Sequence, residues 1–538
     1  MKFIASQWLA AARFSSVATV TLVLAFASAF AGAATTPRYG GTLVVELHAP
    51  SLVLDPLKWK TGAPESAASA QIAAAVFDRL VTLDRFGRFQ PGLATEWSHD
   101  AAWRRWQFTV RAGVQFSDGS DLSAKDVVNA LQELLAEILP VKAVVTTSGA
   151  HVVLQFVSPV PDLLERLASE RYLIYRRDAA GALLGTGAFF LKEFVAAASP
   201  ATLPRYKLPA NEHCWAGRPF ADALEVSVGV PALRQLIDLQ LGKADVVEIS
   251  PELARRAAQE NLHVWASAPV LLYALQVNAE TPAPDRAAVA REATSAKPSG
   301  GEALSLALDR ATMTNVLLQR QAEPAESFLP QWLSGYAFLF DSVFHMDTSV
   351  ERAKETSGPP SGSASRPSTP LPAPLRLRVD ASGDLAKLIA ERVAINARQA
   401  GIPVQVQPHG LARDAFPAAA PGAGKTPDAG LRLLSWRYSS LSERAELDAM
   451  VATLQLAPAA DEKEKPVEDT EQVYLRERRL IAERELIPLV VMPEYIGLGP
   501  SVRDWMAERW GEWHLADVWL DGKRTAVSPG PLPAGVRP

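Results

Sequence analysis

The side chains that most often carry chemistry are scattered along this sequence. Its eight histidines form no H-x-H or H-E-x-x-H pattern; they are His48, His99, His151, His213, His263, His345, His409 and His514. The one cysteine, Cys214, excludes a C-x-x-C pair and an intramolecular disulfide. Because protein metal sites need several such ligands at regular spacing, we predict no metal site and interpret Cys214 as a small apolar residue.

Catalytic motifs are also missing. The sequence contains no G-x-S-x-G elbow, Walker loop or G-x-G-x-x-G. Gly185-Thr186-Gly187 is too short to cradle a phosphate, and we interpret it as a tight turn before a strand at 189–194. Acidic pairs such as Glu225 and Asp238 are too common on solvated faces to define a catalytic dyad. We therefore predict no enzyme activity and no cofactor.

Aromatic side chains are the abundant recognition groups. The chain has 13 tryptophans, a high number for its length. We expect most of them in the core and a few at a cleft, where rigid amphipathic rings bind organic ligands well.

Length and charge narrow the class of protein. The 538 residues correspond to three or four domains of ~150 residues, or to two large lobes. An apolar share of 48% and a charged share of 21% exclude collagen-like, coiled-coil and wholly disordered chains. The net charge of -5 offers no basic surface for nucleic acid, so no nucleic-acid partner is predicted.

The N-terminus has the pattern of an export signal. Residues 14–31 are apolar or small and come after the basic residues Lys2 and Arg13. The small residues Ala31-Gly32-Ala33 at the end of this stretch fit a cleavage site. This pattern predicts a signal peptide over 1–33, cleaved near Ala33. The alternative is an uncleaved anchor, because an 18-residue stretch just spans a bilayer. No cysteine follows, so no lipid anchor is expected, and the mature chain is predicted to be soluble and exported.

Alternating helices and strands must position any site. We expect a strand at 41–47, helices at 66–80 and 124–137, and a strand at 245–249 after a helix that Gly242 stops. Ser123 and Asp126 form a capping box for the helix at 124–137. The alternation predicts an α/β protein. Linkers are expected at 282–301, 417–427, 457–471 and 356–374, the last a flexible Pro/Ser-rich loop.

Several blocks occur in an order typical of one family. They are GGTLVVEL from 40, AAAVFDRLVTLDRFGRFQPGLATEW from 73, WQFTVRAGVQFSDGSDLSAKDVVNAL from 106, GTGAFFLKEF from 185, LIDLQLGKADVVEI from 236 and ALSLALDRATMTNVLLQRQAEPAESFLP from 303. This run resembles family 5, the peptide and nickel type, of the extracellular solute-binding proteins of bacterial ABC importers.

The resemblance implies a two-lobed α/β fold. It would be the type II periplasmic binding protein fold of the large peptide-binding class, with mixed sheets and an interlobe hinge. Lobe I would comprise 38–268 plus 488–538, with 83–184 as an extra subdomain, and lobe II would comprise 269–487.

The resemblance also implies where a ligand would lie. Candidate contacts, each equally open to a packing role, are Trp59, Tyr273, Asn278, Trp436, Arg437 and Tyr438. In peptide-binding members an acidic residue after the lobe II tryptophan pairs with the amino terminus of the ligand, and Ser439 stands near that position here. Arg437 either favours an anionic ligand group or points to solvent. These departures indicate a divergent member.

The leading hypothesis is a periplasmic solute-binding subunit of an ABC importer. It would be a monomer that captures a peptide or similar small organic solute between its lobes and delivers it to a membrane permease. One alternative is a secreted binding or sensor protein of the same fold that is no longer coupled to import. Another is a secreted hydrolase, for which the sequence offers no nucleophile or metal set.

Overall fold

The computed structural model describes most of the chain after the N-terminal segment. The described residues are 36–84, 86–138, 142–197, 203–277, 300–340, 374–381, 383–407, 430–456, 470–508 and 510–522. The predicted signal peptide, Asn278 and nearly all of the four predicted linkers lie outside these residues.

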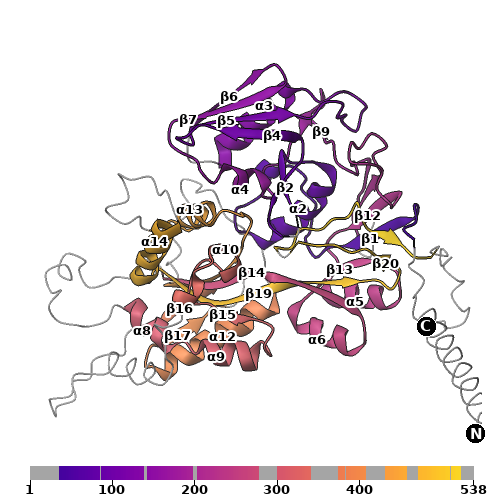
Figure 1. The fold of residues 1–538 in the computed structure, drawn as a ribbon. Coiled ribbons are helices and arrows are strands. Elements are labelled where there is room, and N and C mark those ends of the chain that lie inside the picture. Colours follow the sequence, from indigo (N-terminus) through magenta and orange to yellow (C-terminus); the bar gives the residue numbers. More distant parts are fainter. Residues whose placement is uncertain are drawn as a thin grey trace, which may run out of the picture. The chain divides into compact units, whose positions relative to one another are not determined.

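An eleven-stranded mixed sheet forms the framework (Figure 1). Its order is β10-β11-β12-β1-β13-β19-β14-β18-β16-β17, with β15 paired to β19. The strands are β1 (Thr42–Glu46), β10 (Glu193–Val195), β11 (Arg205–Pro209), β12 (Ala223–Ser227), β13 (Val246–Ile249), β14 (His263–Val277), β15 (Glu323–Pro324), β16 (Leu375–Val379), β17 (Val404–Val406), β18 (Leu431–Arg437) and β19 (Leu486–Leu498). Strand β1 runs parallel to β12 and β13, whereas β14 runs antiparallel to β18 and β19.

The long strands β14 and β19 join the two ends of this sheet. Strand β13 pairs with the last residues of β19, and β18 pairs with the last residues of β14. Between Ala266 and Leu271 the β14–β19 register shifts, and Pro269 there faces Pro493. Because proline has no N–H to donate, the ladder is weakest at this point. The break separates a first half-sheet, β10 to β13, from a second half-sheet, β16 to β18.

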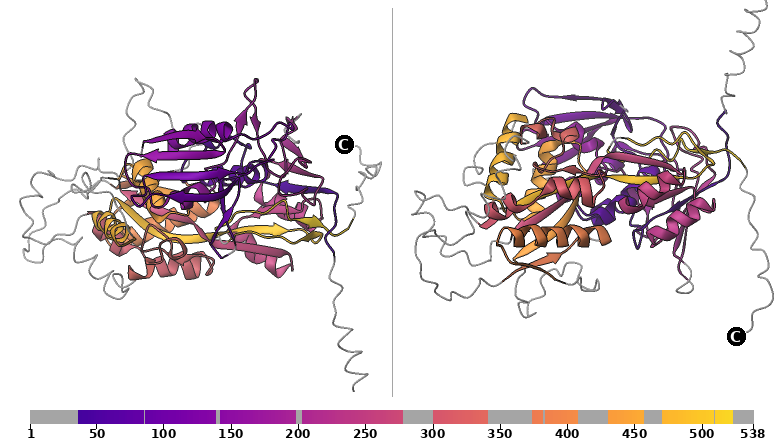
Figure 2. Two further views of the ribbon diagram at one scale, coloured as in Figure 1. Left: turned by 45° about the horizontal axis from the view of Figure 1, so that its top comes forward. Right: turned by 90° about the horizontal axis from the view of Figure 1, so that it is seen from below.

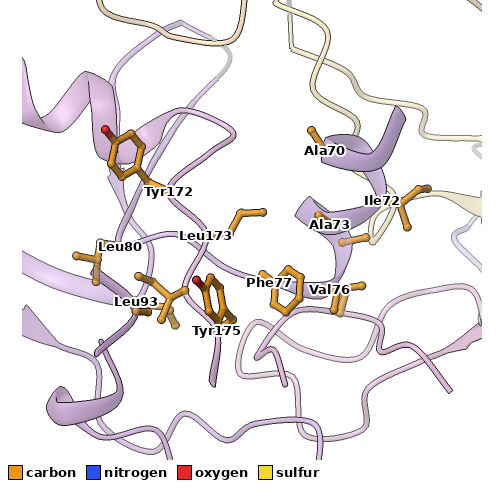
Figure 3. Close-up of a cluster of buried hydrophobic side chains, with 14 of the residues drawn as sticks. Ala70, Ile72, Ala73, Val76, Phe77, Leu80, Leu93, Tyr172, Leu173 and Tyr175 are labelled. Atoms are coloured by element: carbon orange, nitrogen blue, oxygen red, sulfur yellow. The ribbon is translucent and has the colours of Figure 1, made fainter. Parts of the chain in front are cut away.

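One continuous apolar core joins the first half-sheet to α2 (Pro64–Val76), to α3 (Ala124–Ile138) and to a smaller sheet. In Figure 3, Phe77 lies beside Tyr175, and their ring centroids are 6.2 Å apart. The smaller sheet has the order β4-β5-β7-β6, and α3 packs on β6. Figure 2 shows this sheet in indigo and purple. Its strands are β4 (Ala94–His99), β5 (Arg105–Val110), β6 (Ala143–Ser148) and β7 (His151–Phe156).

The second half-sheet is covered on both faces. On one face Leu377 and Leu433 pack against α12 (Asp384–Gln399). On the other face Leu272 and Leu434 pack with α13 (Glu443–Leu454) and α14 (Thr470–Glu483). Figure 1 shows α13 and α14 on the opposite side of this half-sheet from α12. The remaining helices are α4 (Leu163–Ala168), α5 (Ala232–Gln240), α6 (Pro251–Gln259), α8 (Gly300–Ala307), α9 (Arg310–Thr312) and α10 (Gln331–Ser334). Short elements are η1 (Pro56–Lys58), η2 (Met313–Leu317), η3 (Ala337–Leu339), β2 (Val81–Leu83), β3 (Phe89–Pro91), β8 (Arg176–Arg177), β9 (Leu183–Leu184), β20 (Val502–Arg503) and β21 (Trp519–Leu520).

The strongest local predictions are confirmed. Helix α3 starts as the capping box requires: the Asp126 N–H donates to Ser123 Oγ at 3.3 Å, and the Ser123 N–H donates to Asp126 Oδ2 at 2.9 Å. The expected strands at 41–47 and 245–249 are β1 and β13, and Gly242 follows α5 with a φ of +63°.

Two boundaries were predicted wrongly. The helix expected at 66–80 begins at Pro64 and ends at Val76, because Phe77 is extended and Asp78 forms a bridge with Ile174. Of the strand expected at 189–194, only 193 and 194 belong to β10. In both cases pairing with a distant segment overrides the local pattern.

The Gly185-Thr186-Gly187 turn is packed against the end of α2. A Cβ atom on Gly185 would lie 2.0 Å from the Val76 carbonyl oxygen, and the Gly187 N–H donates to that oxygen at 3.0 Å. Thr186 Oγ1 donates to the buried Asp78 at 2.7 Å. The motif therefore acts in packing.

We expect Gly185→Ala to lower the free energy of unfolding by about 3 kcal/mol, since its methyl group meets rigid backbone. The control is Gly181→Ala in the β8–β9 turn, where the added Cβ meets open space and only the left-handed φ of +83° is penalised, by about 1 kcal/mol. Urea unfolding of both variants checks this. Equal losses would contradict the packing role.

Candidate functional site

A narrow crevice lies between the end of α4 and the segment that follows β18. Its first wall is formed by 168–170 with Trp510 and Glu512, and its second wall by Trp332 with 438–441. The cavity volume is about 20 Å³, which is room for about one water molecule. In this arrangement the two walls are closed against each other.

Arg437, the last residue of β18, holds the crevice closed. Its side chain is buried, with Nη1 3.0 Å from Glu170 Oε2 on the opposite wall. Its Nε and Nη2 atoms donate to Glu494 of β19 at 2.8 and 3.3 Å. The interpretation of Arg437 as a solvent-facing residue is therefore wrong. Burial opposes the charge of Arg437, but the two carboxylates outweigh burial and raise its pKa.

The break in the β14–β19 ladder positions this ion pair. The Glu494 N–H donates to Ser267 Oγ at 2.9 Å, at the point where the register shifts. Across the crevice, burial raises the pKa of the Glu170 carboxyl, and the charge of Arg437 opposes that rise. Arg79 also acts on Glu170, and Glu170 acts on Arg171, so positive and negative charges alternate around this ion pair.

Two of the predicted aromatic contacts are fixed by hydrogen bonds. Trp436 Nε1 donates to Glu446 Oε1 at 2.6 Å, and Tyr438 Oη donates to the Phe328 carbonyl at 2.6 Å. The Trp436 ring lies so close to Gly62 that a Cβ atom there would be 2.3 Å from it. Of these two rings only Tyr438 lines the crevice, where Trp332 meets it edge to face.

A buried carboxylate stands behind Ser439. Glu446 of α13 accepts from the Ser439 and Ser440 N–H groups at 3.1 and 2.8 Å, in addition to the Trp436 indole. Burial raises the pKa of Glu446 to about 7, although these donors favour its charged form. Glu446 therefore fixes the conformation of residues 436–440, and its carboxylate oxygens accept hydrogen bonds from protein groups.

Two of the other predicted contacts, Trp59 and Tyr273, do not line the crevice. Trp59 is buried, and its Nε1 donates to the Val53 carbonyl at 2.6 Å. Tyr273 is buried in the core that contains α12, whereas Trp436 belongs to the core on the opposite face of the sheet. Asn278 is outside the described residues. The roles of Trp59, Tyr273 and Asn278 as ligand contacts stay predictions.

Sequence reasoning missed Glu170, Glu494, Glu446 and Trp332. Their spacing carries no motif, because they come from four separate segments that only the fold brings together. A weak signal existed for Glu446, which lies one turn inside a helix that Ser442 caps.

Two further polar links join the start of α4 to α13: Ser442 Oγ donates to Asp162, and Arg166 lies 3.9 Å from Asp448. Among the described residues, no group of three His, Cys, Asp or Glu side chains is arranged to hold a metal ion. In the same part of the chain, every helix is too short or too polar to cross a bilayer.

A mixed sheet in two halves, with a crevice at their junction, defines a two-lobed binding protein. The chain belongs to the bacterial extracellular solute-binding proteins, family 5, since the model of the middle part of that family matches residues 88–440. The periplasmic murein peptide-binding protein MppA of Escherichia coli (strain K12) is 24% identical over 326 residues, which cover 53% of this chain and 56% of that protein. The matched region thus spans little more than half of that relative.

Solved structures show the same fold. The Haemophilus influenzae OppA complex with RPPGFSPFR aligns over 90% of this chain and all of that one, with a TM-score of 0.67 and 16% identity. The Pseudoalteromonas dipeptide-binding protein in complex with Met-Leu aligns over 89% of this chain and all of that one, with a TM-score of 0.66 and 16% identity. The predicted two-lobed fold is confirmed.

We expect Arg437→Met to lower the free energy of unfolding by roughly 3–5 kcal/mol at pH 8, because it leaves Glu170 buried without its counter-charge. The loss should shrink at pH 5. A buried acid with a raised pKa favours the folded state when protonated, and this stabilisation disappears as pH rises through its folded-state pKa.

Denaturant unfolding at pH 5, 6.5 and 8 measures this effect. The matched control is Arg432→Met on the same strand, whose partner Asp380 is partly exposed. If the two variants lose the same stability at every pH, Arg437 does not compensate a buried charge.

Proposed function

We propose that this protein is an exported solute-binding subunit of an ABC importer. It holds a peptide or a similar small organic solute between its lobes and delivers it to a membrane permease. Family membership supports the binding role, and the names of the relatives MppA and OppA include peptide and oligopeptide binding. The names of these relatives also place them in the periplasm, the compartment that we propose for this protein.

The proposed lobes follow the predicted boundaries: lobe I is 38–268 plus 488–538, and lobe II is 269–487. The register break at Ala266–Leu271 supports a hinge near the first boundary. The β4–β7 sheet lies inside the proposed extra subdomain, 83–184.

The single observation that carries the function is the Arg437–Glu170 ion pair across the crevice. When the lobes open, a guanidinium and a carboxylate are released on opposite walls. A zwitterionic ligand such as a peptide offers both complementary charges and can replace the pair. Tyr438 and Trp332 then supply aromatic surface beside these charges. A ligand that bridges the walls only in the closed state shifts the population towards closure.

Native mass spectrometry of the exported protein tests the proposal. We expect an intact mass that exceeds the denatured mass by a few hundred daltons, and fragmentation of the released species should identify a peptide. The denatured mass should place the N-terminus just after Ala33. If no excess mass is found and peptide, sugar and metal-chelate libraries give no thermal shift, the sensor-type alternative is favoured.

A second prediction uses Ser439, a crevice residue whose backbone N–H bond to Glu446 survives substitution of the side chain. We expect Ser439→Trp to reduce affinity for the released ligand at least tenfold, because the indole would occupy space on the crevice wall that the ligand needs when the lobes close around it. The control is Ser148→Trp on the exposed edge of β6. Calorimetry on both variants measures the affinity, and an unchanged value for Ser439→Trp would place the ligand elsewhere.

A further inference from the structure

A second hollow lies on the small β4–β7 sheet. It is formed by the β4–β5 hairpin on one side and by residues 161–165, at the start of α4, on the other. Its volume is about 480 Å³, which lies within the range of small-molecule sites. It shares no lining residue with the crevice at Arg437.

One wall of this hollow is a cluster of aromatic rings. The His99 ring stacks on Trp103 with centroids 3.7 Å apart, and Trp106 lies 5.6 Å from Trp103 at a tilt of 42°. Trp97 and Phe89 extend the same wall. Trp103 is 37% exposed, so this large ring is held at the surface beside a buried Trp106.

The backbone of Trp103 is strained to hold the ring there. Its φ is +54°, a left-handed conformation that costs a non-glycine residue about 1 kcal/mol or more. Two backbone hydrogen bonds hold it: the Trp103 N–H donates to the Asp100 carbonyl at 3.2 Å, and its carbonyl accepts from the Val160 N–H at 2.9 Å. Strain of this kind at a concave surface is more frequent at functional sites than elsewhere.

The opposite wall carries an acidic charge. Glu165 lines the hollow, and its carboxyl group interacts electrostatically with those of Asp162 and Glu443. The nearby Arg166 is bonded to Asp162 at 2.8 Å. In the described part of the chain no Lys or Arg is within ion-pair distance of Glu165. Arginines do stack on other rings, as Arg111 does on Trp215 at 4.3 Å, but within the described residues none stacks on Trp97, Trp103 or Trp106.

We propose that this hollow, walled by Trp97, Trp103, Trp106 and Glu165, is a second binding site that takes an organic cation of the alkylammonium class. The faces of indole rings attract cations, most strongly those whose charge is spread over methyl groups. Because no Lys or Arg among the described residues pairs with Glu165, its carboxylate can act as the counter-charge for a bound cation. This site is independent of the solute that we propose for the crevice.

The test uses choline and its neutral isostere 3,3-dimethylbutan-1-ol as probes of the mature protein. Calorimetry and tryptophan fluorescence report binding. We expect choline to bind at least about fivefold more tightly than the isostere, since the two differ only in the charge that the rings and Glu165 recognise. Equal affinity for both probes, or no choline binding at about 50 mM, a concentration that would nearly fill a site with a Kd of about 1 mM, overturns the proposal.

Variants locate the binding. Glu165→Gln and Trp103→Gly should each weaken choline binding about fivefold or more, and glycine accepts the left-handed backbone at 103 without strain. The matched control is Glu96→Gln, which removes an exposed carboxylate from β4, the strand that carries Trp97. This variant should bind choline as the parent protein does. Circular dichroism confirms that each variant is folded. Choline affinity unchanged in both Glu165→Gln and Trp103→Gly would overturn the site.

The crevice-blocked Ser439→Trp variant separates the two proposals. It should keep full choline affinity while it loses the crevice ligand. If Ser439→Trp loses choline binding while Glu165→Gln retains it, choline binds in the crevice and the proposal of a second site is overturned. Failure of the crevice ligand alone leaves the choline result intact.

Discussion

The antiparallel pairing of β14 with β19 is the constraint on which the rest of the structure depends. These two strands carry one sheet from one half of the protein into the other, so the two halves cannot separate, yet the ladder is interrupted where Pro269 faces Pro493. The continuous β14–β19 pairing keeps the two walls of the crevice aligned, and its interruption is a point at which the sheet can bend. The candidate site lies at this interruption because Glu494, Ser267 and the end of β18 all meet there.

A buried ion pair at that point has a definite physical consequence. Removing Arg437 and Glu170 from water is costly, and the cost is offset only while both partners and Glu494 are in contact. The closed arrangement is therefore sensitive to anything that competes for either charge. In a two-lobed binding protein this sensitivity couples ligand chemistry to lobe position, because the competing groups of a ligand act on the same contact that joins the walls.

The two concave sites differ in character. The crevice is narrow, charged and made by residues from distant segments, whereas the hollow on the β4–β7 sheet is open, aromatic and largely local. Its strained Trp103 comes from the β4–β5 hairpin, and the lining residues from outside that hairpin are Phe89 of β3 and Pro161, Leu164 and Glu165. A local site of this kind can bind or release a ligand without movement of the lobes.

The sequence by itself determined the elements and the family. Short-range rules placed the cap of α3, the stop after α5 and the strands β1 and β13, because hydrogen bonds within a few residues decide these features. The order of the sequence blocks between residues 40 and 330 indicated the resemblance to the family. Among the site residues, Trp436, Arg437 and Tyr438 could be named because the family resemblance pointed to this stretch at the end of β18.

Only the tertiary structure decided what those residues do. Whether Arg437 faces solvent or a carboxylate depends on Glu170, 267 residues away in the chain, and Tyr273 faces a core rather than the crevice because of the register of β14 with its neighbours. The early end of α2 at Val76 likewise follows from pairing with a distant segment. Contacts between segments so far apart leave no local pattern, since their energy exists only when the sheet has already brought the segments together.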